Sequence, residues 1–332
     1  MANEKTDVLV WGPEKTTIVD GLSKRFMLHK VNSREDINAV VPKIAPHLRA
    51  IAISLTGPFA RVDEALMATM PKLEIVSSFG VGYDHIDAAW AGQHGIIATH
   101  TPDVLNEEVA DTAMGLLLCT VRQLPQADNF VRRGDWPREK DFQHTQTLRD
   151  RTVGIVGLGR IGKAIARRLD ASHVPVVYHG RNKQADVAYR YYPHLVEMAR
   201  EVDVLMVITP GGAGTKHLID AQVLEALGPT GILINVARGS VVDEKVLIEA
   251  LQKKKIYSAG LDVFENEPNV PQALIDMEQV VLLPHVGSAS LYTRQAMDQL
   301  VVDNLFAWAE GRPPLTPVPE TPWHGKWSKR PS

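Results

Sequence analysis

The chain has 332 residues, of which 45% are hydrophobic and 23% charged, with a formal net charge of −3. This length predicts about two domains, and the apolar fraction excludes a disordered chain. The near-neutral charge without basic blocks argues against nucleic acid or an anionic membrane surface as a partner. No apolar run approaches the roughly 20 residues of a membrane span. One cysteine, Cys119, excludes an internal disulfide and a cysteine metal cluster. We therefore expect a soluble cytoplasmic protein without a metal site.

The first hundred residues alternate short apolar runs with helix-sized intervals. The runs are residues 8–11, 50–55, 73–79 and 96–98. This alternation is typical of βαβ units and a parallel sheet. A helix is predicted over 104–122, where Val109, Ala113 and Leu117 share one face, and we expect it to cross between two domains.

A second alternating series begins at Arg151 and predicts a doubly wound α/β domain. Its strand candidates are residues 152–156, 175–179, 203–208, 231–236, 259–264 and 280–283. A further helix is expected over 288–310. The predicted fold class is therefore α/β with two doubly wound parallel-sheet domains.

A glycine-rich loop follows the first strand of this second series. The run Gly157-Leu158-Gly159-Arg160-Ile161-Gly162 lies between a buried strand and an amphipathic helix, which is the context that a dinucleotide requires. Gly157 permits the tight turn, Gly159 lets the pyrophosphate approach the backbone, and Gly162 permits close packing of helix and strand. The helix amides and dipole then favour the phosphates.

The residues after the next strand predict the choice of cofactor. An NAD site normally offers a carboxylate to the ribose about 20 residues downstream, but this chain reads Gly180-Arg181-Asn182 and has no carboxylate until Asp186. Arg181 can hold a 2′-phosphate with its planar set of donors, and Asn182 can add a hydrogen bond. We therefore predict NADPH or NADP as the preferred cofactor, with weaker use of NADH or NAD.

Three polar residues follow the carboxyl ends of predicted strands in the same sheet. They are Arg238, Glu267 and His285. Ligands of open α/β sheets bind outside these strand ends, so the three side chains can converge beside a nicotinamide. Each also has a structural interpretation, as a turn residue, a solvated charge and a strand-end histidine.

The chain resembles the D-isomer-specific 2-hydroxyacid dehydrogenases, and within them the glyoxylate/hydroxypyruvate reductase branch that includes the hydroxyphenylpyruvate reductases. The matching motifs span residues 77–84, 101–105, 108–111, 154–162, 235–240, 260–268 and 283–288. The resemblance implies that Arg238, Glu267 and His285 are catalytic. It also implies a flavodoxin-like substrate domain (1–100 and 286–332) into which a Rossmann cofactor domain (101–285) is inserted, and a homodimer built around the helix from 104 to 122.

The mechanism of reduction follows from the charge that develops on the substrate. Reduction of a 2-keto acid places negative charge on the carbonyl oxygen, so a proton donor must lie within hydrogen-bond reach. His285 suits this role, because a carboxylate partner at Glu267 would stabilise its imidazolium and fix the ring orientation. Arg238 can hold the substrate carboxylate and polarise the ketone.

The first domain is expected to contribute the other wall of the site. Family members bind the substrate carboxylate through backbone amides that match Val81 and Gly82, and a plain turn is the alternative. Ser288 either bonds the substrate hydroxyl or caps the following helix. We expect Trp136 to pack within its own chain rather than to reach a partner subunit. The loops at 55–59 and 136–145 are expected to line the pocket.

Further residues are predicted to contact the cofactor. With the glycine loop, Arg181 and Asn182, they are Gly180, Thr209, Pro210, Thr215, Val236, Ala237, Asp262, His285 and Gly287. The run 208–217 departs from the usual family pattern, and its small residues predict a more mobile loop near the nicotinamide ribose.

The leading hypothesis is an NADPH-preferring reductase of glyoxylate and hydroxypyruvate that forms D-2-hydroxy acids. Hydroxyphenylpyruvate or another 2-keto acid remains an alternative substrate. Formate dehydrogenase is less favoured, because that relative carries glutamine where this chain has Glu267. Phosphoglycerate dehydrogenase is disfavoured by Arg181 and by the lack of a C-terminal regulatory domain. A dinucleotide-sensing corepressor-like binding module is the alternative that is not an enzyme, since the fold alone does not decide function.

Overall fold

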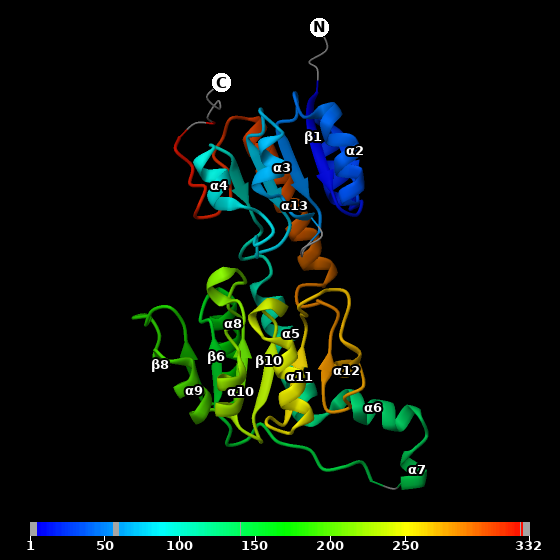
Figure 1. Ribbon diagram of the computed structural model, residues 1–332, viewed down its shortest axis with the longest axis vertical. Helices are drawn as coiled ribbons and strands as arrows, with labels where there is room; N and C mark the ends of the chain where they lie inside the picture. The colour runs from blue at the N-terminus through cyan, green and yellow to red at the C-terminus, as the bar shows by residue number, and fades with distance from the viewer. Residues whose placement is uncertain (1–4, 56–59, 140, 326, 328–332) are drawn as a thin grey trace. The chain divides into compact units, whose positions relative to one another are not determined.

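The computed structural model describes residues 5–55, 60–139, 141–325 and 327 of the chain. It divides into two compact units: unit 1 comprises Met1–Leu105 and Ser290–Ser332, and unit 2 comprises Asn106–Ala289 (Figure 1). The sequence placed these divisions after residues 100 and 285. In the structure both divisions come later in the chain. Asn106 begins a helix that packs on the strands of unit 2. At the second division, the Val286 and Gly287 amides donate hydrogen bonds to the Asp262 carboxylate of unit 2.

Unit 1 is built on five parallel strands in the order β2-β1-β3-β4-β5. They are β1 (Thr6–Trp11), β2 (Phe26–Val31), β3 (Ala50–Ile53), β4 (Ile75–Ser78) and β5 (Ile97–Thr99). Strand β2 was not predicted, because it lies at the sheet edge and only its two end residues are buried, so it does not form an apolar run. The chain moves outward from β1 to β2 and then returns to β3 on the other side of β1. The direction of winding therefore reverses between β1 and β3.

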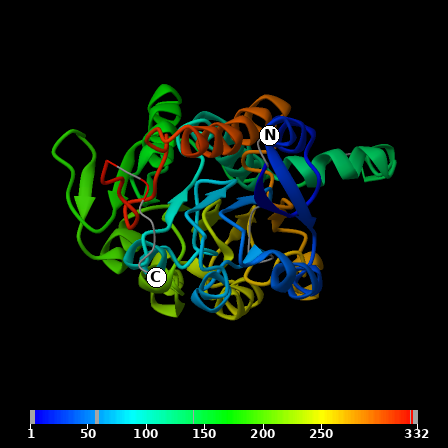
Figure 2. The same cartoon turned by 90° about the horizontal axis from the view of Figure 1, so that it is seen from above.

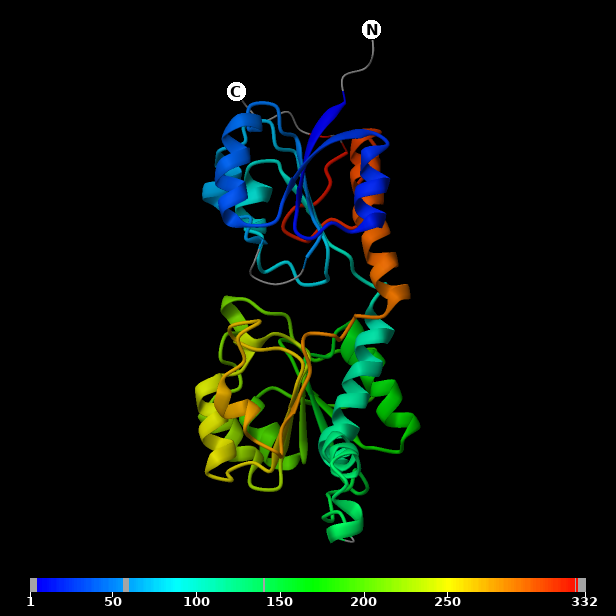
Figure 3. The same ribbon diagram turned by 90° about the vertical axis from the view of Figure 1, so that its right-hand side faces the viewer.

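Helices cover both faces of this sheet. They are α1 (Thr16–Ser23), α2 (Arg34–Ile44), α3 (Glu64–Ala68), α4 (Ala88–Gln93) and α13 (Leu291–Ala309). Helices α1 and α13 pack together on one face, and α2, α3 and α4 lie on the other (Figure 2 and Figure 3). The C-terminal segment also joins this unit, because the Thr321 hydroxyl bonds to both the amide and the carbonyl of Ala98. Unit 1 is thus assembled from both ends of the chain.

Unit 2 is built on seven parallel strands in the order β12-β11-β10-β9-β6-β7-β8. They are β6 (Val153–Val156), β7 (Val176–His179), β8 (Arg190–Tyr192), β9 (Val204–Val207), β10 (Ile232–Asn235), β11 (Ser258–Leu261) and β12 (Val281–Leu282). Six of these match predicted strands. The seventh, β8, was missed and is again an edge strand with a polar first residue, Arg190.

Two cores lie on opposite faces of the second sheet, because residues of a strand alternate between faces. In β9, Val204 and Met206 face the core under α5 and α8, whereas Leu205 and Val207 face the core under α9 to α11. The helices are α5 (Asn106–Arg122), α6 (Leu124–Arg132), α7 (Trp136–Glu139), α8 (Arg160–Ala171), α9 (Leu195–Glu201), α10 (Ala221–Leu227), α11 (Glu244–Gln252) and α12 (Gln272–Ile275). Short 3-10 turns at Ala213–Thr215 and Gly239–Val241 complete the unit.

The α/β class with two doubly wound parallel sheets is confirmed. Among the described residues, no helix has the length and apolar character needed to cross a membrane. Both sheets present the carboxyl ends of their strands to loops, and these loops hold the residues considered next.

Candidate active site

The glycine loop of unit 2 leaves space where a dinucleotide would need it. Gly157 follows β6 with φ = 103°, and a Cβ there would lie 2.8 Å from the backbone of Thr209. A Cβ on Gly162 would lie 2.3 Å from the Gly157 carbonyl oxygen, so only glycine permits this contact of helix and loop. In contrast, a Cβ on Gly159 would have nothing within 4 Å. The space in front of Gly159 is therefore open to a ligand.

Helix α8 begins directly at this open space. Its N-cap is Gly159, which has no side chain to bond the first amides, and its buried face carries Ile165 and Leu169. Uncapped amides and the positive end of the helix dipole suit a phosphate group. The loop and helix start thus fit the pyrophosphate of a dinucleotide.

The loop after β7 lacks a free carboxylate. Gly180 accepts a hydrogen bond from the Tyr191 hydroxyl at 3.1 Å, and Arg181 and Asn182 that follow it are exposed. Within the described part of the chain, the Arg181 guanidinium makes no hydrogen bond or ion pair. Asp186 bonds to Lys163 at 2.6 Å, and this hydrogen bond lowers the pKa of the Asp186 carboxyl. Arg181 and Asn182 are therefore both exposed and available to a phosphate.

The other predicted cofactor residues belong to unit 2. Leu158 is buried, and its carbonyl accepts a hydrogen bond from Gln184 at 2.6 Å. Thr209 and Pro210 follow β9, and the Thr215 hydroxyl bonds to the Pro210 carbonyl at 2.6 Å. Val236 and Ala237 are buried just after β10. Arg160 and Ile161 form the first turn of α8.

His285 and Glu267 form a direct pair. The His285 Nδ1 atom lies 2.7 Å from Glu267 Oε2, and Glu267 Oε1 accepts the Phe264 amide at 3.1 Å. Burial alone would raise the pKa of the Glu267 carboxyl. The hydrogen bond and charge of His285, the Phe264 amide and Arg238 together lower it below its usual value. The structure therefore holds Glu267 as a carboxylate against one ring nitrogen, and the other ring nitrogen remains for a substrate.

Asp262 holds the backbone around His285. The residue is 2% exposed, and its two carboxylate oxygens accept the amides of Val286 at 2.7 Å and Gly287 at 2.9 Å. The His285 amide donates to the Asp262 carbonyl, and His285 has φ = 55°. A left-handed conformation is uncommon for a residue with a side chain and requires such support. Burial raises the pKa of the Asp262 carboxyl.

Arg238 lies at the end of the neighbouring strand. It follows β10, and the Asn235 side-chain amide donates to the Arg238 carbonyl at 3.1 Å. The next residue, Gly239, packs so tightly that a Cβ would lie 1.9 Å from the Phe264 backbone, on the segment that leads to Glu267. Arg238 also lowers the pKa of Glu267 through its charge. Arg238, Glu267 and His285 thus follow adjacent strands β10, β11 and β12 at one edge of the sheet.

The predicted substrate residues divide between the units. Val81 and Gly82 belong to unit 1, where the Val81 carbonyl accepts His100 Nδ1 at 2.8 Å and the preceding Gly80 has φ = 118°. Ser288 does not cap α13, because the cap is Ser290, whose hydroxyl accepts the Thr293 amide. The capping role that was one alternative for Ser288 is therefore wrong, and the other alternative, a hydrogen bond to the substrate hydroxyl, stays a prediction.

The expected packing role of Trp136 within its own chain is also wrong, because the residue is 59% exposed at the start of α7. Of the loops predicted to line a substrate pocket, residues 56–59 and 140 lie outside the described residues.

Similarity to known proteins agrees with this geometry. Residues 114–287 match the model of the D-isomer specific 2-hydroxyacid dehydrogenase, NAD binding domain. The chain belongs to the D-2-hydroxyacid dehydrogenase family. A glyoxylate/hydroxypyruvate reductase A of Arabidopsis thaliana and a hydroxyphenylpyruvate reductase of Plectranthus scutellarioides are each 44% identical over 315 residues, covering 95% of this chain and 99% of the relative.

A solved structure is also similar to this chain. It is an NADPH-dependent glyoxylate/hydroxypyruvate reductase of Sinorhizobium meliloti in complex with NADP and malonate. That chain is 50% identical, with a TM-score of 0.91 and coverage of 96% of this chain and 98% of the other. The resemblance read from the motifs is confirmed.

Proposed function

We propose that this D-2-hydroxyacid dehydrogenase is an NADPH-preferring reductase that converts small 2-keto acids, glyoxylate and hydroxypyruvate, to D-2-hydroxy acids. The observation that carries the proposal is the His285–Glu267 pair, with His285 Nδ1 at 2.7 Å from Glu267 Oε2 at the carboxyl edge of the cofactor sheet. A histidine held in this way by a carboxylate presents its other nitrogen to the substrate as a proton donor.

The roles of the side chains follow from the charge that develops during reduction. The bound nicotinamide supplies a hydride. His285 donates a proton to the substrate carbonyl oxygen, and Glu267 stabilises the imidazolium and orients the ring. Arg238 holds the substrate carboxylate and draws electron density from the ketone. In the oxidative direction His285 accepts the proton of the alcohol.

The preference for NADPH rests on Arg181. Its guanidinium is exposed at the end of β7, and the nearest carboxylate along the loop, Asp186, is bonded to Lys163. A planar arginine suits a phosphate, and a carboxylate at this position would repel it. Asn182 adds a donor. NADH, which lacks the 2′-phosphate, gains nothing from Arg181 and binds more weakly.

Substrate binding is assigned to Val81, Gly82, Arg238, His285 and Ser288. Gly80, whose φ of 118° favours glycine, turns the backbone so that the Val81 and Gly82 segment follows β4 as a loop. Backbone amides in such a loop suit a carboxylate. Hydroxyphenylpyruvate is the second candidate substrate, favoured by the relative of that name at 44% identity.

A substrate panel tests the proposal. NADPH oxidation is measured with glyoxylate, hydroxypyruvate, pyruvate and hydroxyphenylpyruvate at equal concentration. We expect kcat/KM to be highest for glyoxylate or hydroxypyruvate. The highest value for hydroxyphenylpyruvate would select the second candidate. Turnover of none of the four would favour the corepressor-like binding module.

We also propose a cytoplasmic homodimer. Large apolar side chains are exposed on consecutive helices of unit 2: Leu118 of α5, Leu124 and Val131 of α6, and Trp136 of α7. A surface of this kind commonly marks a protein interface. Light scattering at micromolar concentration should give twice the mass of 36.6 kDa, and a monomer would contradict the proposal. The single cysteine, Cys119, favours a reducing compartment.

A further inference from the structure

The loop that follows β4 in unit 1 carries two backbone amides that are open to a ligand. Among the described residues, neither the Val81 amide nor the Gly82 amide donates a hydrogen bond. Both lie in the segment proposed to bind the substrate carboxylate. The direction in which these amides point therefore decides how well they can bind it.

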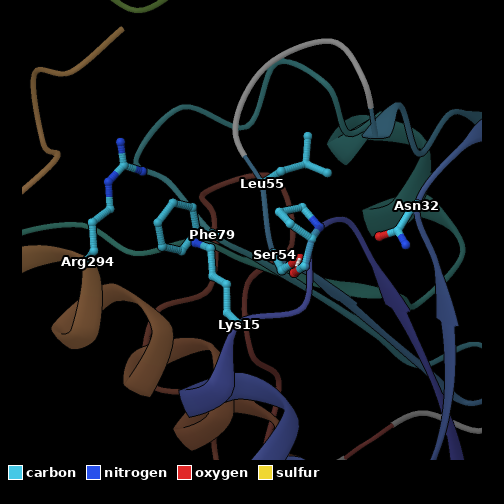
Figure 4. A pocket seen from close by; sticks show the side chains of 7 residues that line it. Lys15, Asn32, Ser54, Leu55, Phe79 and Arg294 are labelled. Atoms are coloured by element: carbon cyan, nitrogen blue, oxygen red, sulfur yellow. Dashed lines mark hydrogen bonds between the residues drawn. The ribbon is translucent and has the colours of Figure 1, made fainter. Parts of the chain in front are cut away.

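The start of this loop is fixed on the sheet. Phe79 is 1% exposed, and the Lys15 ammonium lies 3.0 Å from the centroid of its ring. Figure 4 shows Lys15 and Arg294 reaching the Phe79 ring from the start of α1 and from α13. Gly80 then turns the chain with φ = 118°, and its amide donates to the Thr101 hydroxyl at 2.9 Å. The loop therefore leaves the sheet in a fixed direction.

Two consecutive carbonyls of the loop accept hydrogen bonds from one neighbouring segment. The Gly80 carbonyl accepts the Thr101 amide at 2.9 Å, and the Val81 carbonyl accepts Nδ1 of His100 at 2.8 Å. A carbonyl oxygen can only accept, so Nδ1 of His100 carries the proton. Both peptides are trans, and in a trans peptide the carbonyl and the following N–H point in opposite directions. The Val81 and Gly82 amides therefore both point away from His100 and Thr101.

The backbone of His100 is held independently of its side chain. Thr316 of the C-terminal segment accepts the His100 amide at 3.2 Å through its carbonyl and donates its hydroxyl to the His100 carbonyl at 2.6 Å. The imidazole is partly buried and meets the Tyr83 ring edge to face, with centroids 5.4 Å apart. A substitution at His100 can therefore remove the bond to Val81 while the backbone of residue 100 stays in place.

We propose that His100 is a positioning residue for the substrate carboxylate, acting through the Val81–Gly82 peptide. Its hydrogen bond to the Val81 carbonyl directs the Gly82 amide outward and polarises the peptide, which makes that amide a stronger donor. The Val81 amide, directed in the same way by the Thr101 amide, is the second donor. Successive N–H groups in a turn form a concave anion site. The inference rests on the proposed function, because it takes the anion to be the carboxylate of the keto acid.

Three variants separate the donor of His100 from its ring. His100→Leu removes both the donor and the ring. His100→Asn also removes the ring but keeps a donor, because the asparagine amide nitrogen is as many bonds from Cα as Nδ1 of histidine. His94→Leu is the matched control, because His94 is another histidine of unit 1 whose Nδ1 bonds a backbone carbonyl, that of Trp90 at 2.8 Å.

Steady-state kinetics with glyoxylate and NADPH are measured in each variant. In His100→Leu the KM for glyoxylate should rise about tenfold, which corresponds to weakening one hydrogen bond to a charged group. The kcat should stay within about twofold, because the carboxylate is bound equally before and during hydride transfer. His100→Asn and His94→Leu should keep the KM within about twofold of wild type. A loss of kcat and of melting temperature that His100→Asn shares with His100→Leu would mean a structural role and overturn the proposal.

The Gly82 amide gives a direct signal of carboxylate binding. Oxamate, a carboxylate that the hydride does not reduce, is added with NADPH to the full chain containing isotope-labelled glycine. The Gly82 signal in the NMR spectrum is identified by its loss in Gly82→Ala. We expect oxamate to move the Gly82 proton downfield in wild type and in His100→Asn, and His100→Leu should need about tenfold more oxamate. Sodium chloride at equal concentration controls for ionic strength.

The outcomes separate this inference from the proposed function. If the glyoxylate KM is the same in His100→Leu and wild type, His100 does not position the carboxylate, and the proposed function stands. A Gly82 signal that oxamate leaves unmoved in an active wild type has the same meaning. A wild type that turns over no keto acid, but whose Gly82 signal responds to oxamate more readily than that of His100→Leu, would contradict the proposed function and support the role of His100.

Discussion

Unit 1 and unit 2 use the same kind of sheet, but the cations at their carboxyl edges are paired differently. In unit 2, His285 Nδ1 contacts Glu267, and Asp262 holds the surrounding backbone. In unit 1, Lys15 contacts Asp298 and covers the face of Phe79. The first arrangement places a ring nitrogen of histidine against a carboxylate, whereas the second places a lysine ammonium against both a carboxylate and an aromatic ring. The topology of each sheet makes the carboxyl edge of its strands accessible to a ligand. The residues that follow the strands then decide which chemistry can occur at that edge.

The largest expected effect is a loss of reaction rate when the carboxyl edge of the unit 2 sheet is altered. His285→Ala removes the proposed proton donor of unit 2 and should lower kcat about 10³-fold, within the usual range for loss of a general acid. Steady-state oxidation of NADPH at saturating glyoxylate measures kcat. His29→Ala is the control, because His29 of β2 also contacts a carboxylate, Asp7 at 2.8 Å, and is assigned no role in catalysis or binding. Full activity in His285→Ala would refute the proposed mechanism.

The next effect distinguishes the two roles of glycine in the cofactor loop. Gly159→Ala adds a methyl group in open space, so the melting temperature should stay within about 2 °C while the Kd for NADPH rises about 100-fold. Gly162→Ala meets the Gly157 carbonyl at 2.3 Å and should lower both stability and affinity. Thermal unfolding with and without NADPH measures both. Unchanged NADPH affinity in Gly159→Ala would move the phosphate site elsewhere.

A smaller effect concerns cofactor preference. Arg181→Ala should lower the ratio of kcat/KM for NADPH to that for NADH by about 10-fold to 100-fold, since it removes charged hydrogen bonds to a phosphate. Arg190→Ala provides the comparison, because Arg190 is an exposed arginine of β8 that pairs with Glu201. If the ratio is the same in Arg181→Ala and wild type, Arg181 does not select the cofactor.

The smallest effect is on acid stability. The pKa of Glu267 is lowered in the folded chain, so its carboxylate stabilises the fold above the unfolded value of about 4.3, and this contribution is lost as the pH falls through the folded pKa. Glu267→Gln should therefore reduce the loss of stability between pH 6 and pH 3.5 by about 1 kcal/mol or less. Urea unfolding at both pH values measures it. An unchanged pH dependence would mean that Glu267 is not held as a carboxylate.

The central strands of both sheets were predictable from sequence because they are buried on two faces and read as apolar runs. The two strands that were not predicted, β2 and β8, are edge strands in which most residues are partly or fully exposed, as Met27 at 53% exposure illustrates. The placement of Arg238, Glu267 and His285 at one edge of the second sheet was predictable, because they follow strands that are adjacent in the sheet, and their catalytic roles stay a prediction. The hydrogen bonds by which Asp262 supports the backbone around His285 depend on atomic geometry, which the spacing of residues along the sequence does not reveal.

The contact between Lys15 and Asp298 in unit 1 could not be predicted from the sequence for a related reason. Lys15 and Asp298 are 283 residues apart and belong to no motif. Only the return of α13 to the first sheet brings Asp298 and Arg294 to Lys15.

That return of α13 also affects how the chain folds as it is synthesised. Unit 2 is continuous from Asn106 to Ala289 and can form once those residues have left the ribosome. The five strands of unit 1 emerge earlier, but α13, which packs against α1, β3 and β4, is made last. The apolar face that α13 covers in the folded chain therefore stays uncovered while the whole of unit 2 is translated. The first domain to be synthesised is the last to be completed, and this interval is when the nascent chain most needs a chaperone.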